Sequence, residues 1–315
     1  MTMALDLPLA QHVATVVLNL AVAAAVGAAA TGWSTGKLAS PWARLQDHRA
    51  HRGAVAMLVV AIVASVCVLW LEAAAMAEVP VTQAVAETLT MLTGTHLGAA
   101  WQVGTEALVV SLIAMALSSP GRRATGWSLV SLVGIAVFLY TRSMVSHASA
   151  GGDFSIMMLV DWVHLMLICV WVGEVFVSGL MVLSPLPEEQ HADRADCVRY
   201  VQSLSTSATV ALIGIFATGL ANAWYNLGSP GALVSTQYGA TLLVKLALVL
   251  GAAALGGGNR FIVMPGLIEA LQTGNAPGIR KARRFALVLR IEAIVLLGVL
   301  MAAAVLSATS PPTAG

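Results

Sequence analysis

Long apolar stretches alternate with short polar segments along the whole chain. The stretches are rich in Leu, Val, Ala and Gly, and they lack the strict alternation of apolar and polar residues that is typical of barrel strands. A helix of about 20 residues crosses the roughly 30 Å hydrocarbon core of a bilayer. The pattern therefore predicts an all-α membrane protein with eight transmembrane helices. These cover residues 11–31, 54–77, 97–118, 125–146, 158–183, 203–225, 239–258 and 285–307.

The composition agrees with a membrane protein, since 58% of the 315 residues are hydrophobic and only 10% are charged. The longest polar stretch, residues 184–200, is too short to form a core of its own. We therefore expect residues 1–315 to form a single integral-membrane helical domain. No Lys or Arg precedes Lys37, so the first apolar stretch is expected to be a retained helix and not a signal peptide. The lipid bilayer is an expected partner, and the near-neutral chain without a basic tail gives no indication of nucleic-acid binding.

Among the segments that connect the predicted helices, basic residues occur only in alternate ones. The segments with Lys or Arg contain Lys37, Arg44, Arg49, Arg52, Arg122, Arg123, Arg194, Arg199, Arg260, Arg280, Lys281, Arg283 and Arg284. The segments 78–96, 147–157 and 226–238 contain none. Because cytoplasmic loops carry the excess of Lys and Arg, both termini are predicted to lie outside, in the periplasm. Segment 78–96 is longer than a tight hairpin, and either an amphipathic surface helix or a simple loop would fit it.

Four histidines fall near the predicted outer ends of four helices and can share one layer of the bundle. Imidazole suits copper in either oxidation state, and thioether favours Cu(I). The sequence therefore predicts a copper site in this layer, with Asp161 orienting His164 by accepting its second N–H. The predicted ligands are His96, His147, His164, His12, Met144 and Met157. The alternative for each is structural, because His also anchors helices at membrane interfaces and Met is common on lipid-facing surfaces.

Ionisable residues inside the apolar stretches form a second group. A single charge at mid-bilayer costs about 2.5–3.5 kcal/mol on insertion scales, so these side chains are expected to pair or to line a wet cavity. Lys245 and Glu106 both lie in the outer half of the membrane by depth and could meet. Either structural ion pairing or an inward route for a cation would explain the group, and Cys169 is either a Cu(I) relay or a small core residue. The candidate path residues are Cys169, Glu174, Glu106, Lys245 and Glu292.

Several motifs, in this order and spacing, resemble the copper resistance D family (CopD/PcoD). The resemblance is densest over residues 140–312. The matching segments are Thr95-His96-Leu97-Gly98 with Trp101, Ser146-His147-Ala148-Ser149-Ala150, Asp161-Trp162-Val163-His164 continuing to Trp171-Val172-Gly173, Tyr238-Gly239 through Leu242-Leu243 to Lys245, Asn259-Arg260, Arg290-Ile291-Glu292 and Ser310-Pro311-Pro312. The chain departs from the family pattern at Gly104, where an Arg is frequent, and at Glu174, where a second Gly is common.

The resemblance implies an eight-helix inner-membrane protein that moves copper inward and works with a periplasmic copper-binding protein of the CopC type. A haem b-binding redox protein is an alternative, because transmembrane cytochromes also place His on facing helices. A copper sensor or store without transport is a third possibility. No nucleophile elbow, phosphate loop, HExxH or dinucleotide fingerprint is present, so an enzyme is not expected. The sequence does not indicate the oligomeric state.

Overall fold

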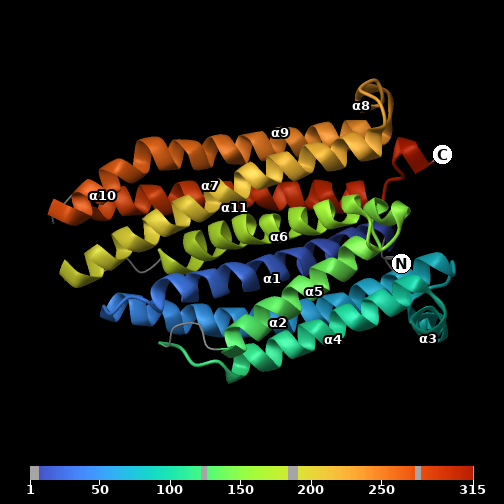
Figure 1. Cartoon of the computed structure of the whole chain (residues 1–315), viewed down its shortest axis with the longest axis horizontal. Coiled ribbons are helices and arrows are strands. Elements are labelled where there is room, and N and C mark those ends of the chain that lie inside the picture. The colour runs from blue at the N-terminus through green and yellow to red at the C-terminus, as the bar shows by residue number, and fades with distance from the viewer. Residues whose placement is uncertain (1–6, 122–125, 184–190, 274–277, 315) are drawn as a thin grey trace, which may run out of the picture.

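The computed structural model describes residues 7–121, 126–183, 191–273 and 278–314 (Figure 1). Within these ranges eight helices are long and apolar enough to cross a membrane, which confirms the predicted fold class. The main helices are α1 (Leu7–Thr35), α2 (Pro41–Met76), α4 (His96–Leu117), α5 (Gly126–Met144), α6 (Ile156–Val177), α7 (His191–Leu227), α9 (Gln237–Gly258) and α11 (Gly278–Ser307). The π-helical turn η3 (Ser178–Val182) extends α6, and η4 (Asn259–Val263) with α10 (Met264–Thr273) extends α9.

The bundle has two distinct ends (Figure 1). Both chain termini lie at one of them, together with α3 (Val85–Gly94), η2 (His147–Gly151) and α8 (Ala232–Ser235). We call this the terminal end. The opposite end carries α10 and the basic residues of the segment that joins α1 to α2, and we call it the basic end. Arg122 and Arg123 lie outside the described residues.

Segment 78–96 is largely helical, with η1 (Val81–Gln83) leading into α3. Met91 of α3 is buried beside Leu69 and Ala73 of α2. A Cβ on Gly98 would lie 2.1 Å from the Met91 carbonyl oxygen, so α4 begins in close backbone contact with α3. The structure therefore favours the helical alternative for this segment over the simple loop. That the helix lies on the membrane surface stays a prediction.

The helices run beyond the apolar stretches at the basic end. α2 begins at Pro41 instead of near residue 54, because Ser40 caps it by accepting a hydrogen bond from Ala43 N at 3.2 Å. Two carboxylates from the start of α7 satisfy further amides there. Asp196 accepts from Ser40 N and Asp193 accepts from Trp42 N, each at 3.0 Å. These contacts fix the start of α2 against α7, beyond the edge of the apolar stretch that the sequence shows.

Glycines allow the central helices to approach closely. α1 packs against α2, α6 and α11, and it crosses α6 at Gly27 and Gly173. A Cβ on Gly173 would lie 1.8 Å from the Ala23 carbonyl oxygen, which no real contact tolerates. Small residues at crossings are the usual means of tight helix packing in lipid, where apolar burial alone drives little association. The α1–α6 contact thus sets the centre of the bundle, around which the other helices are placed.

Candidate metal-binding site

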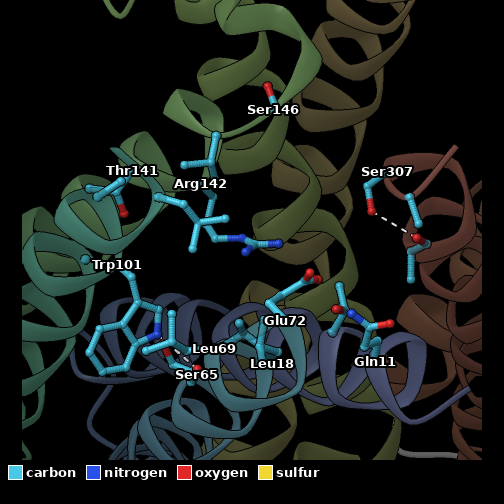
Figure 2. Close-up of a pocket in the computed structure, with 18 of the residues that line it drawn as sticks. Gln11, Leu18, Ser65, Leu69, Glu72, Trp101, Thr141, Arg142, Ser146 and Ser307 are labelled. Carbon is cyan, nitrogen blue, oxygen red and sulfur yellow. Dashed lines mark hydrogen bonds between the residues drawn. The ribbon is translucent and has the colours of Figure 1, made fainter. Parts of the chain in front are cut away.

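A cavity of about 670 Å³ is present at the terminal end, between α1, α2, α4, α5, η2 and the end of α11. Most of its lining is apolar, with Leu18, Leu69 and Phe138 among the wall residues. The described lining residues include only two with a formal charge, Glu72 and Arg142. Their side chains point toward each other across the cavity (Figure 2). The cavity therefore combines a low-dielectric wall with two opposite charges.

Glu72 and Arg142 begin a row of opposite charges that crosses the bundle. Glu72 is close enough to Arg142 and to Gln11 to interact electrostatically with both. Arg142 lies between two carboxylates, since it also interacts with Asp161 of α6. Asp161 in turn interacts with Lys245 of α9. We call Glu72, Arg142, Asp161 and Lys245 the charge row. Their formal charges sum to zero, which is how buried ions in a membrane protein are usually compensated.

Hydrogen bonds from neighbouring helices hold Asp161 in place. Ser143 Oγ and Ser146 Oγ donate to its Oδ2 at 2.9 and 3.1 Å, and Asn222 Nδ2 donates to its Oδ1 at 3.0 Å. Both carboxylate oxygens are thereby occupied. The partner of His164 is a different residue, so the structure does not show the predicted hydrogen bond between Asp161 and His164. Asp161 instead links α5, α6 and α7 below the cavity.

His147 lines the cavity, and one of its ring nitrogens is buried without a hydrogen-bond partner among the described residues. It is the first residue of η2, and the Ser146 hydroxyl caps this turn by accepting from Ala148 N at 3.2 Å. The Nε2 atom of His147 is buried and has no hydrogen-bond partner among the described residues. Buried polar atoms in folded proteins nearly always have a partner, so an unpaired imidazole nitrogen in a cavity wall is a candidate ligand position.

His12 lines the same cavity from the start of α1. It lies close enough to Glu72 for the two side chains to interact electrostatically. The cavity thus brings two imidazoles, from His12 and His147, to the same space as one carboxylate. Within the described part of the chain, no three His, Cys, Asp or Glu side chains are already arranged as a metal site. Binding a metal here would need these side chains to move toward a common centre.

His96 lies apart from the cavity. It is the first residue of α4, its side chain is 55% exposed, and its Nε2 is 3.0 Å from Asp153 Oδ2. The helix that follows turns inward, because Leu97 and Trp101 both line the cavity. His96 is therefore at the surface of the terminal end, beside the cavity wall but not in it.

His164 is buried on α6 against α7. Its Nδ1 is 2.8 Å from Thr218 Oγ1, and this hydroxyl is also 2.6 Å from the Gly214 carbonyl oxygen. Because the hydroxyl proton is directed to that carbonyl, the hydroxyl accepts from Nδ1–H of His164. The Nε2 lone pair of neutral His164 is then available. His164 is not among the residues that line the cavity, and Lys245 lies close enough to interact with it electrostatically.

The two predicted methionine ligands also lie outside the cavity lining. Met144 ends α5 and Met157 begins α6, and both are half-buried. Of the six predicted ligands, the structure therefore brings only His12 and His147 together in one cavity.

Two family descriptions match the chain. "Copper resistance protein D-like, N-terminal domain" matches residues 4–155, and "Copper resistance protein D" matches residues 198–306. The chain belongs to the copper resistance protein D family. It is 28% identical over 230 residues to copper resistance protein D of Pseudomonas syringae pv. tomato, a match that covers 72% of this chain and 70% of that protein. It is 29% identical over 177 residues to the copper transport protein CutJ of Bacillus subtilis (strain 168), covering 55% of this chain and 29% of CutJ. No solved structure matches the chain.

The ionisable residues deeper in this copper resistance D chain have mainly structural partners. Trp171 Nε1 donates to Glu292 Oε1 at 3.2 Å, and Glu292 is only 2% exposed. Glu174 lies near Ser207, and its Oε2 is buried without a partner among the described residues. Cys169 is buried in the main hydrophobic core. Cys169 and Glu174 lie on α6, and Glu292 of α11 contacts α6 through Trp171.

The possible contact between Glu106 and Lys245 is not present in the structure. Glu106 is exposed on the outer surface of α4, whereas Lys245 faces Asp161 across the α6–α9 region. Similar depth in the membrane did not bring the two residues together because they lie on different faces of the bundle.

Two central residues of the site, Glu72 and Arg142, were missed by reasoning from the sequence. Both lie inside predicted membrane helices, and an ionisable residue in such a position is a candidate functional residue by default. That signal was available. The sequence does not show, however, that the two residues face each other across one cavity.

Proposed function

We propose that this chain accepts copper in the cavity at the terminal end and moves it across the inner membrane toward the basic end. Membership of a copper resistance family supports copper handling. The observation that carries the site assignment is the buried, unpaired Nε2 of His147 in a cavity that His12 and Glu72 also line. Imidazole nitrogen binds copper well, and a carboxylate adds charge compensation.

The uneven distribution of Lys and Arg between the two ends supports the proposed direction of copper movement. The segments at the basic end carry Lys and Arg, which the positive-inside rule assigns to the cytoplasm, so the cavity would face the periplasm. A periplasmic copper-binding protein of the CopC type would then deliver copper to the terminal end. The exposed His96, with its partner Asp153, lies on the surface that such a protein would meet first.

The route below the cavity would use the remaining predicted residues. His164 presents a free Nε2 just beyond the charge row, and Met144 and Met157 lie near the same end of the bundle. Cys169, Glu174 and Glu292 follow toward the basic end along and beside α6. Cys169 also packs in the hydrophobic core, and Glu292 also accepts a hydrogen bond from Trp171.

Copper uptake into proteoliposomes tests the function. We expect wild-type protein to take up Cu(I) faster than protein-free vesicles do. The double variant His12→Ala/His147→Ala should reduce uptake to the protein-free level, because it removes both imidazoles from the cavity. His48→Ala is the matched control, since His48 is exposed at the basic end and should leave uptake unchanged. Equal uptake by wild type and double variant would show that the cavity is not the entry site.

Two other outcomes would redirect the proposal. Wild-type uptake no faster than in empty vesicles, combined with tight copper binding, would favour a sensor or store. A haem absorption band in freshly purified protein would favour the haem-binding alternative.

A further inference from the structure

One of the charged side chains that line the cavity, Arg142, also interacts with a charged residue outside it. Arg142 lies between Glu72 and Asp161, and Lys245 compensates Asp161 from the far side. If a bound metal took over Glu72, Arg142 would still be close enough to Asp161 to interact with it electrostatically. A cation in the cavity is therefore always close to a guanidinium, which stays charged under all ordinary conditions.

The residues around Arg142 increase the effect of its positive charge on a cation in the cavity. Apart from Glu72 and Arg142, the described lining has no formal charge, and it includes the aliphatic and aromatic side chains of Leu18, Leu69 and Phe138. Neutral polar side chains such as Gln11 and Thr141 complete the wall, so the site is only partly apolar, and Coulomb interactions in it are stronger than in bulk water. The cost of removing an ion from water rises with the square of its charge, so a dication loses more than a monocation on entering. Repulsion from Arg142 is also twice as large for a dication.

The candidate ligands do not offset the higher cost that a dication pays on entering the cavity. His12 and His147 bind metal only as neutral imidazoles, and Glu72 supplies one negative charge against the positive charge of Arg142. The site is thus neutral before the metal enters. Two imidazoles and one carboxylate hold Zn²⁺ in some enzymes, but here the positive charge of Arg142 opposes the single carboxylate of Glu72 in the same cavity.

From this charge balance we infer that the cavity selects a monovalent soft cation, Cu(I) over Cu(II), and that Arg142 sets this preference. The inference rests on the proposed copper-accepting function of the same cavity and adds the charge of the ion that it takes. Arg142 is a specificity-determining residue that acts by its charge and is not itself a ligand.

Competition titrations with Ag(I) and Cd(II) on the purified protein in detergent test the inference. Both ions are soft and stable to redox change, so they differ mainly in charge. Wild-type protein should bind Ag(I) more tightly than Cd(II). Arg142→Gln should raise the affinity for Cd(II) relative to Ag(I) by about tenfold or more, because the resident positive charge is gone. Arg142→Lys, which keeps the charge, should retain the wild-type ratio.

A second pair of variants distinguishes an effect of the altered charge balance from an effect of damage to the fold. Glu72→Gln leaves Arg142 uncompensated and should weaken Cd(II) binding more than Ag(I) binding. The double variant Glu72→Gln/Arg142→Gln is neutral again, and its Ag(I)/Cd(II) ratio should return toward the wild-type value although both affinities fall. A cavity that is merely distorted would not restore the ratio.

The outcomes distinguish this inference from the function on which it rests. If wild-type protein binds neither ion, the copper-accepting cavity itself is wrong. If it binds Ag(I) but the ratio is the same in Arg142→Gln and Arg142→Lys, copper capture stands and the role of Arg142 is wrong. Cd(II) binding at least as tight as Ag(I) binding in the wild type would also overturn the preference for a monovalent ion.

Discussion

Hydrogen-bond partners distinguish residues that stabilise the bundle from residues that are free to bind. Trp171 Nε1 has Glu292 as its acceptor, and Asp161 has three donors around it. His147 Nε2, by contrast, is buried without a partner among the residues that the structure describes. Glu292 and Asp161 are thus already satisfied in the folded protein, while His147 keeps a nitrogen for a ligand.

This difference predicts separate effects for two changes at Glu292. Glu292→Ala leaves the buried Trp171 N–H without an acceptor and should lower the free energy of unfolding by about 1–3 kcal/mol. Glu292→Gln keeps an acceptor oxygen and should be close to wild type in thermal unfolding in detergent. Equal stability of the two variants would contradict the structural role of Glu292. A stable Glu292→Gln variant with reduced copper uptake would show that the carboxylate also takes part in copper transport.

Among the helices, the closest approach is the crossing of α1 and α6. Gly27 and Gly173 meet there with backbone against backbone, and Gly173 belongs to the Trp171-Val172-Gly173 motif. The motif therefore has a packing role that is separate from any chemistry. It allows α6, with His164 and Asp161, to lie directly against α1, which carries His12.

Substitution at this crossing should destabilise the whole bundle. Gly173→Ala places a methyl group 1.8 Å from the Ala23 carbonyl oxygen, so the helices must separate. Overpacking of this kind typically costs about 1–3 kcal/mol, and more where backbone is the obstacle. Gly251→Ala is the matched control, because nothing lies within 4 Å of a Cβ at that position of α9. Thermal unfolding of the two variants in the same detergent would decide, and equal melting temperatures would contradict the crossing.

Over the whole molecule, the bundle places its termini and its basic segments at opposite ends. The proposed orientation predicts that the terminal end faces the periplasm. A Cys introduced at the exposed Ser229 should react with a membrane-impermeant maleimide in intact cells. A Cys at the exposed Thr273, at the end of α10, should react only after lysis. Cys67 is the exposed native thiol and would be replaced in both variants. The reverse labelling pattern would show that the terminal end faces the cytoplasm.

The sequence predicted the fold well because span length and hydrophobicity alone determine which segments cross a bilayer. It also predicted that His12 and His147 lie at the same end of the bundle, since this follows from position along a helix. It did not predict the direction in which each residue faces. Glu106 faces outward, His164 faces Thr218, and Glu72 meets Arg142 because of contacts between helices that no single stretch of sequence contains.

The most direct test of the central claim is the stoichiometry and affinity of Cu(I) binding to the purified protein, measured by competition with a chromophoric chelator under reducing conditions. We expect wild-type protein to bind Cu(I) tightly. His12→Ala/His147→Ala should lose this binding, while His48→Ala should retain it. Tight Cu(I) binding that is unchanged in the double variant would contradict the assignment of the terminal-end cavity as the copper site.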